Sequence, residues 1–332
     1  MKEDHPKINY GKTGLLLVNL GTPESTSWRD IRKYLKEFLS DRRVIEVNPL
    51  LWKIILNVFI LNFRPSKTAK AYKEIWMKKE NMSPLRYYTH MQTKKLAKKL
   101  ENNNFLVDFA MRYGIPSIKS KMEKLQKKGC ENIIVLPLYP QYAAATTATV
   151  CDEVYKSLMK MRWQPSLQII PHYESEPLYI SALGNSLNKK ISELNWSPDL
   201  ILASYHGIPK KYFEKGDPYH CYCQKTSRLL SEKFTKFPIK TTFQSRFGPQ
   251  EWLQPYTDKT LESLPKEGKK NILVICPGFS SDCVETLEEI SIQGKKTFLD
   301  NGGKNFDVVP CLNDGEDHIN LLVHLTKKYF SG

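Results

Sequence analysis

Eight short apolar runs alternate with longer amphipathic stretches, and this alternation limits the possible fold more than any other feature of the chain. The runs are apolar on both faces, and each is followed by turn residues and then by helical periodicity. The pattern predicts an α/β protein whose parallel sheets are covered by helices on both sides. The runs lie at residues 14–20, 105–111, 132–139, 167–171, 199–205, 239–245, 271–276 and 306–312.

An internal echo indicates that the chain consists of two related halves. The run NIIVLP at 132–137 and the run NILVICP at 271–277 are each followed by an aromatic residue, a small-residue loop and a helical pattern. A chain of 332 residues is also long enough for two cores. We therefore predict two similar Rossmann-like domains, at 1–165 and 166–315, with a cleft between them. A C-terminal helix at 316–332 is expected to pack back on either domain.

The formal net charge of +15 is compatible with nucleic acid, anionic lipid or a carboxylate-bearing substrate as partner. The basic residues are mostly lysines spread along the whole chain, without an arginine-rich arm, an RNA-binding signature or zinc-finger spacing, so nucleic acid is not an expected partner. The first residues lack the apolar region of a signal peptide, which favours a cytoplasmic protein. The seven cysteines then read as free thiols.

Residues 49–63, PLLWKIILNVFILNF, form a dense apolar segment that interrupts the strand and helix pattern. The segment is shorter than the roughly 20 residues that a membrane-spanning helix needs. Two interpretations remain open at this point. The segment is either a core helix, or an exposed lip that covers an apolar ligand or touches a membrane surface peripherally.

Candidate catalytic residues follow the strands of the second half, because ligands bind beyond the carboxyl ends of parallel strands. His206 ends one apolar run, and Glu285 and Glu289 begin the helix that follows another. An imidazole and carboxylates at one edge can share protons or hold a metal. Each residue also has an interpretation without a catalytic role. Asp282 and Glu285 have the spacing of a helix N-terminal capping pattern. His206 can be a core histidine, with His172 as the rival candidate.

Flat side chains gather in the loops at the same predicted edge, which favours a wide planar ligand. Two arginines beside them can pair with acidic substituents of such a ligand. These candidate substrate-binding residues are Arg112, Tyr113, Tyr139, Tyr142, Arg246, Trp252 and Phe279.

Several motifs occurring in order give the chain a resemblance to the ferrochelatase family, whose members insert ferrous iron into a porphyrin. The motifs are LVNLGTPES, SPL at 83–85, MRYG at 111–114, LYPQY at 138–142, SYHGIP at 204–209, GDPY at 216–219, FQSRFGPQEWLQPYTD at 243–258 and CPGFSSDCVETLEEI at 276–290.

The resemblance implies two Rossmann-like domains of the chelatase fold, a porphyrin between them, and a substrate-covering lip at residues 34–80. It implies a lyase that converts protoporphyrin IX and Fe²⁺ into protohaem and two protons, with no required cofactor. His206 corresponds to the active-site histidine and Glu285 to its partner carboxylate, with both as metal ligands and Glu289 behind them. A non-catalytic porphyrin carrier, or a chelatase for coproporphyrin or Co²⁺, is the alternative.

Three departures from the family pattern affect the details. Leu20 stands where members that act on coproporphyrin tend to have tyrosine, which favours protoporphyrin. Cys283 stands where many members have histidine. The C-terminal cysteines that hold a [2Fe-2S] cluster in animal members are absent, although internal Cys151, Cys221 and Cys223 could still carry one. The oligomeric state stays open, and a peripheral position at the inner membrane is compatible with the lip.

Overall fold

The predicted strands are all present in the computed structural model, which describes residues 11–101 and 104–330. The ten N-terminal residues and the last two, which fall in the predicted first domain and C-terminal helix, lie outside this description. The strands are β1 (Lys12–Gly21), β2 (Phe105–Tyr113), β3 (Cys130–Pro137), β4 (Ser166–Ile169), β5 (Leu200–His206), β6 (Ile239–Gln244), β7 (Asn271–Ile275) and β8 (Asn305–Val308).

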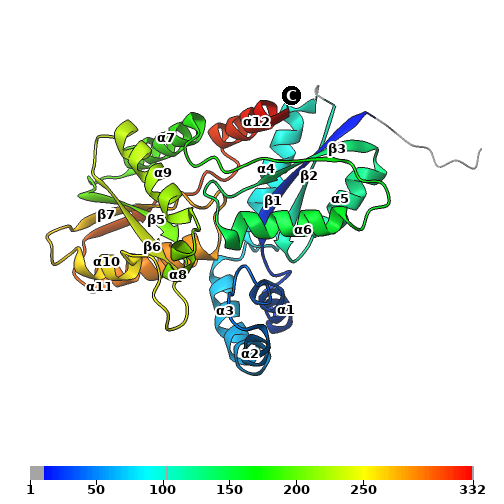
Figure 1. The fold of residues 1–332 in the computed structure, drawn as a ribbon. Coiled ribbons are helices and arrows are strands. Elements are labelled where there is room, and N and C mark those ends of the chain that lie inside the picture. The colour runs from blue at the N-terminus through cyan, green and yellow to red at the C-terminus, as the bar shows by residue number, and fades with distance from the viewer. Residues whose placement is uncertain (1–10, 102–103, 331–332) are drawn as a thin grey trace, which may run out of the picture.

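The strands form two four-stranded parallel sheets with the same internal order. The first sheet runs β2-β1-β3-β4 and the second β6-β5-β7-β8. The first strand of each half thus lies between the second and third strands of that half, which confirms the internal repeat. The two halves lie side by side in Figure 1.

Helices flank both sheets, as the doubly apolar strands require. In the first half these are α4 (Pro84–Lys99), α5 (Ile118–Lys127), the π-helix η3 (Ala144–Ala148) and α6 (Thr149–Leu158). In the second half they are α7 (Pro177–Glu193), α8 (Lys210–Glu214), α9 (Tyr219–Lys233), α10 (Thr257–Ser263), the π-helix η4 (Glu285–Gly294) and α11 (Lys295–Asp300).

The boundary between the halves lies later than predicted. β4 begins at Ser166, directly after the predicted boundary, yet it pairs with β3 and therefore belongs to the first sheet. The crossover to the second half is the segment between Ile169 and Pro177. The last helix, α12 (Glu316–Phe330), packs against α4 and α7 and so joins both halves, as its position in Figure 1 shows.

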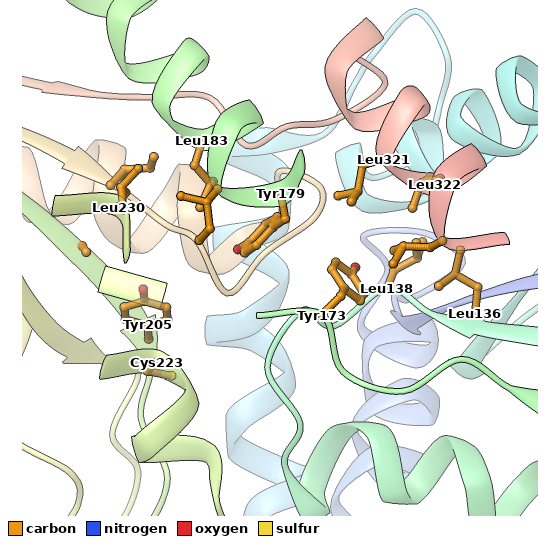
Figure 2. Packing of buried hydrophobic residues seen from close by; sticks show 14 of the residues in the cluster. Leu136, Leu138, Tyr173, Tyr179, Leu183, Tyr205, Cys223, Leu230, Leu321 and Leu322 are labelled. Atoms are coloured by element: carbon orange, nitrogen blue, oxygen red, sulfur yellow. The ribbon is translucent and has the colours of Figure 1, made fainter. Parts of the chain in front are cut away.

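The seam between the halves is a continuous apolar core. Leu136 and Leu138 of the first half, Tyr179 and Leu183 of α7, and Leu322 of α12 belong to one cluster of buried side chains. Figure 2 shows Leu321 and Leu322 of α12 facing Leu136 and Leu138 of the first half, with Tyr179 and Leu183 of α7 to one side. The two halves are therefore held together by apolar burial as well as by the chain crossover.

The apolar segment at 49–63 is part of a helical insertion between β1 and α4, below the two sheets in Figure 1. The insertion comprises α1 (Trp28–Leu39), α2 (Pro49–Ile55), the π-helix η1 (Leu56–Ile60) and α3 (Leu61–Ile75). None of the residues of α2 is buried, so this part of the segment is an exposed lip. Leu56 and Leu61 farther along the segment are buried in a cluster with residues of α1, so the lip also has a small core of its own. Among the described residues no helix has the length and apolar character needed to cross a membrane. The exposed apolar residues of the lip are Val47, Leu50, Leu51, Ile54, Val58, Phe59 and Phe63.

Candidate active site

His206 is the last residue of β5, a central strand of the second sheet, and its side chain is half-buried. Its Nδ1 lies 2.6 Å from the carbonyl oxygen of Gly207. Because a carbonyl oxygen only accepts hydrogen bonds, Nδ1 carries the proton and Nε2 keeps its lone pair. The imidazole lies 6.4 Å from the Trp252 ring, centroid to centroid. His206 is therefore oriented with one basic nitrogen available for a proton or a metal ion.

Glu289 of η4 is held by the residues that follow β6. The backbone N–H of Ser245 donates to Glu289 Oε1 at 2.7 Å, and its hydroxyl donates to Oε2 at 2.5 Å. Ser245 has a φ of 65°, a conformation that few residues with side chains adopt, so the backbone is strained where it grips the carboxylate. Burial raises the pKa of Glu289, while the Ser245 hydrogen bond and nearby His206 oppose the rise.

Glu285 is the first residue of η4 and lies against the lip. Its carbonyl oxygen accepts a hydrogen bond from Gln244 Nε2 at 2.8 Å. Burial raises the pKa of Tyr72 in the lip, and the charge of Glu285 raises it further. The helix α3, which carries Tyr72, packs against η4. The Glu285 carboxylate therefore faces a buried part of the lip.

The capping interpretation of Glu285 is wrong. Asp282 accepts hydrogen bonds from the side chain of Asn313 at 2.6 Å and from the hydroxyl of Thr286 at 3.0 Å. The residue before η4, Val284, makes no capping bond with its side chain. Asp282 instead fixes the loop that leads into η4, which leaves the Glu285 carboxylate for other contacts.

The structure brings the three predicted catalytic residues to one edge of the second sheet. Burial is the main cause of the raised pKa of Glu289. The charge of His206 lowers this pKa and the charge of Glu285 raises it, so Glu289 lies close to both residues. The rival His172 is instead engaged on both ring nitrogens. Its Nδ1 lies 2.6 Å from Glu174 Oε2 and its Nε2 lies 3.2 Å from the Tyr222 hydroxyl.

A cavity of about 230 Å³ adjoins Glu289 and is lined by residues of the second half. Ligand pockets for drug-sized molecules measure about 300–1,000 Å³, so this cavity suits water or an ion rather than a macrocycle. Its polar lining includes Arg246, Asp258 and Gln293. Arg246 forms an ion pair with Asp258 at 2.5 Å and stacks over Tyr256 at 4.3 Å. Arg246 therefore lines this outer cavity.

The other predicted substrate-binding residues are divided between the two halves. Trp252 is buried near His206 and donates its indole N–H to the carbonyl of Phe247 at 3.0 Å. Leu20 and Phe279 are half-buried and pack against core clusters, Leu20 in the first half and Phe279 in both. Burial and the charge of Asp217 raise the pKa of the half-buried Tyr142.

Arg112 and Tyr113 lie at the end of β2 and are both bound to Asp41 of the lip. The Arg112 guanidinium lies 2.5 Å from the Asp41 carboxylate, and the Tyr113 hydroxyl donates to the same oxygen at 3.0 Å. Tyr139, also named among the flat side chains, is buried at the end of the first half's β3, and its hydroxyl has no partner. The first half thus contributes a paired arginine and an unpaired phenol.

Arg64 of α3 is a further candidate ligand-binding residue, which the rule of strand ends does not select. One nitrogen of its guanidinium is buried without a hydrogen-bond partner, and burial lowers its pKa. The guanidinium lies over the Phe247 ring at 4.3 Å, so the lip touches the loop that follows β6. An unpaired buried cation is unfavourable unless an anion reaches it. In the sequence it was only one of several basic residues flanking the apolar segment.

The three cysteines considered for a [2Fe-2S] cluster lie on two different helices. Cys151 lies on α6 of the first half, whereas Cys221 and Cys223 lie on α9 of the second half. Residues two apart on a helix face different sides, and here Cys223 is buried while Cys221 is exposed. Within residues 11–101 and 104–330, no group of three or more His, Cys, Asp or Glu side chains is arranged to hold a metal ion.

The chain is similar over its whole length to proteins of known families. A family model described as Ferrochelatase matches residues 12–329. The ferrochelatase of Allorhizobium ampelinum is 56% identical over 100% of this chain and 97% of that protein. The ferrochelatase of Rhizobium meliloti is 56% identical over 99% of this chain and 98% of that protein. The solved sirohydrochlorin chelatase SirB from Bacillus subtilis subspecies spizizenii, in complex with cobalt, shares the fold, with a TM-score of 0.53, 10% identity and 97% coverage of each chain.

Proposed function

Because the chain belongs to the ferrochelatase family, we propose that it inserts Fe²⁺ into protoporphyrin IX, forming protohaem and releasing two protons. Family membership makes the protein a metal-chelating enzyme whose substrates are a porphyrin and a metal ion. The finer assignment to the lyase class and to protoporphyrin is our proposal. The observation that carries it is the grouping of His206 and Glu289 with Glu285 at one sheet edge.

His206 and Glu289 are the proposed proton acceptors. Metal insertion must remove two pyrrole protons, which requires basic groups over the centre of the ring. The free Nε2 of His206 can accept one proton or contact the metal. Because burial raises the pKa of Glu289, its carboxylate can hold a proton nearer to neutral pH than an ordinary glutamate. The cavity beside Glu289 offers a route for that proton towards solvent.

Glu285 is the proposed carboxylate ligand for the incoming Fe²⁺. Carboxylate and imidazole both bind ferrous iron, so Glu285 and His206 can hold the ion on its way into the ring. A non-catalytic carrier would need a porphyrin site but not a strained backbone that grips a buried carboxylate. This arrangement favours an enzyme over the carrier.

The porphyrin is expected to lie between the lip and the second sheet. Leu20 offers an apolar side chain at the end of β1, which suits the vinyl groups of protoporphyrin better than the additional carboxylates of coproporphyrin. Arg64 and Arg112 can pair with the two propionates. The contact of Arg64 with Phe247 means that the lip lies closed against the second half in this structure, so entry of the ring requires the lip to move.

We also propose that the protein is cytoplasmic and rests peripherally on a membrane through the lip. Leu50 is 77% exposed and Phe63 is 75% exposed, and further apolar side chains surround them. A helical surface of this kind binds at the level of the lipid headgroups, and flanking basic residues strengthen the attachment to anionic lipid. An apolar porphyrin could then pass directly between the membrane and the enzyme.

The proposal is tested by anaerobic incubation of the purified protein with Fe²⁺ and protoporphyrin IX. The absorption bands of the free porphyrin should convert to those of haem at a rate proportional to protein concentration. Coproporphyrin in place of protoporphyrin, and Co²⁺ in place of Fe²⁺, separate the alternative chelatases. Tight porphyrin binding without conversion by any of these metals would instead support the carrier. The absorption spectrum of the protein before porphyrin is added tests for an iron–sulfur cluster.

A further inference from the structure

The arginine that the proposed reaction would use to bind a substrate carboxylate already holds a carboxylate of the protein. Arg112 lies at the carboxyl edge of the first sheet, where ligands of parallel sheets bind. Its guanidinium is paired with Asp41 at 2.5 Å, and its Nε donates to the carbonyl of Thr149 at 2.8 Å. The side chains of Arg112 and Asp41 are 9% and 13% exposed. A second carboxylate therefore cannot reach Arg112 while Asp41 stays in place.

Asp41 is also the first residue of an irregular segment, residues 41–48, which we call the strap. The strap connects α1 to α2 of the lip. It is fastened to the first half by Arg43, whose guanidinium forms a bidentate pair with Asp152 of α6, at 2.5 and 3.0 Å. The backbone N–H of Arg43 also donates to Asp41 at 2.9 Å. The position of Asp41 is thus tied to that of the strap.

The other end of the strap is fastened to the second half of the molecule. Glu46 forms an ion pair with Lys215 at 2.6 Å. The hydroxyl of Tyr212 on α8 donates to the carbonyl of Val44 at 3.2 Å and accepts from the backbone N–H of Glu46 at 3.0 Å. The strap therefore bridges both halves, and its first side chain occupies the arginine at the sheet edge.

We propose that Asp41 competes with the substrate for Arg112, occupying the guanidinium until a substrate carboxylate replaces it. The inference rests on the proposed function, because it requires a porphyrin that carries carboxylates. Exchange of one carboxylate for another keeps the charge and the hydrogen bonds of the guanidinium. A ring with uncharged substituents makes no such exchange, since removal of Asp41 would leave a buried cation unpaired.

The exchange has a structural consequence for the lip. Once Asp41 leaves Arg112, the first residue of the strap loses its bonds to both Arg112 and Tyr113. The strap then keeps the ion pairs of Arg43 and Glu46 and the hydrogen bonds of Tyr212, so binding of an acidic porphyrin loosens only the end of the strap at Asp41, while a neutral one does not. Asp41 is in this sense a positioning residue for the lip and a competitor for the substrate.

The test compares the binding of protoporphyrin IX and of its dimethyl ester, which lacks carboxylates, by metal-free fluorescence titration. In Asp41→Asn the competitor loses its charge, and we expect the dissociation constant of the diacid to fall about tenfold. The dissociation constant of the ester should stay unchanged. Glu46→Gln is the matched control, because it removes another carboxylate of the strap that faces Lys215 rather than Arg112. It should leave the ratio of the two constants as in the wild type.

Asp41→Glu covers the case in which Asp41→Asn does not fold. It preserves the charge beside Arg112 but misplaces the carboxylate, so it should shift the diacid constant in the same direction by a smaller factor. If a folded Asp41 variant binds the diacid more weakly than the wild type, or binds the diacid and the ester more tightly by the same factor, the inference about Asp41 is wrong. The proposed function is not affected by either result. Wild-type protein that binds neither porphyrin would contradict the proposed function as well, so the two failures are distinguishable.

Discussion

The two halves of the molecule share one strand order but carry different chemistry at their carboxyl edges. In the first half, β1 is followed by the lip, and the edge holds Arg112, whose partner is a lip carboxylate. In the second half, β5 ends at His206 and is followed by the short helix α8. The edge there holds proton acceptors. One scaffold therefore presents a guanidinium at one edge and an imidazole with carboxylates at the other.

The π-helices sharpen the same contrast. Each half has one after its third strand, η3 in the first half and η4 in the second. η3 has the sequence AATTA and carries no ionisable side chain, whereas η4 begins ETLEE. Such helices are rare and often occur at functional sites. The backbone irregularity is thus common to both halves, and only the second half combines it with carboxylates.

Replacing the imidazole of His206 should have the largest effect, because it should lower the rate of metal insertion while leaving porphyrin binding at the first edge intact. We expect His206→Ala to lower kcat for metal insertion by about 10²–10⁴-fold, because a positioned proton acceptor contributes that much. Porphyrin affinity should change little, since the proposed carboxylate contacts lie in the first half and the lip. The measurement is haem formation under anaerobic conditions together with fluorescence titration of the metal-free porphyrin. His172→Ala, away from this edge, is the control, and equal losses in both variants would remove His206 from the mechanism.

The seam between the halves should respond to acid through His318. This residue of α12 is fully buried, its Nδ1 donates to the Asn313 carbonyl, and burial lowers its pKa to about 4. The unfolded chain binds a proton at higher pH than the folded protein. Stability is therefore lost as the pH falls from about 6.5 to about 4, by roughly 3 kcal/mol in total.

Chemical denaturation between pH 7.5 and 4.5 measures this loss. His318→Asn keeps a donor towards Asn313 but cannot titrate, so its stability should fall less steeply over the same range. An identical slope in the variant and the wild type would show that other groups govern the acid sensitivity of the seam.

The sequence predicted the repeated scaffold well, because strands that are buried on both faces must be apolar on both faces. All eight strands follow from that rule, and β4 was placed in the wrong half only because its four residues reveal no pairing partner. The position of His206 followed from the rule that ligands bind beyond strand ends. The hydrogen bonds from Ser245 to Glu289 could not be predicted in this way. They depend on the left-handed backbone conformation of Ser245, which no local sequence pattern indicates. The pairing of Arg112 with Asp41 joins residues 71 positions apart and was equally invisible.

Removing the charge of Glu289 tests whether this carboxylate at the edge of the second sheet takes part in proton transfer. We expect Glu289→Gln to lower kcat about 10²-fold, the lower end of what a positioned proton acceptor contributes, and to displace or remove the acid limb of the pH profile. Glu288→Gln is the control on the same helix, because the Glu288 carboxylate accepts from Gln293. Profiles that coincide for wild type and Glu289→Gln would exclude a proton-transfer role.

The same variant should also change stability with pH. Because burial raises the pKa of Glu289, the protonated form is favoured on folding, and this contribution is lost as the pH rises through the folded-state pKa. Glu289→Gln should therefore unfold at a higher temperature than the wild type at pH 8 but not at pH 4. Thermal unfolding at the two pH values measures the difference.

The smallest expected effect concerns the lip, which has no counterpart in the second half. Phe63 is 75% exposed on α3, and Met159, directly after α6 of the first half, is 79% exposed. Substitution of either by serine should change the unfolding free energy by less than about 0.5 kcal/mol, because neither side chain is packed. If the lip enters the lipid interface, Phe63→Ser should weaken co-sedimentation with anionic vesicles by about tenfold, from the lost burial of one aromatic side chain. Met159→Ser should leave it unchanged, and equal sedimentation of both variants with the wild type would mean that the apolar surface of the lip serves only the porphyrin.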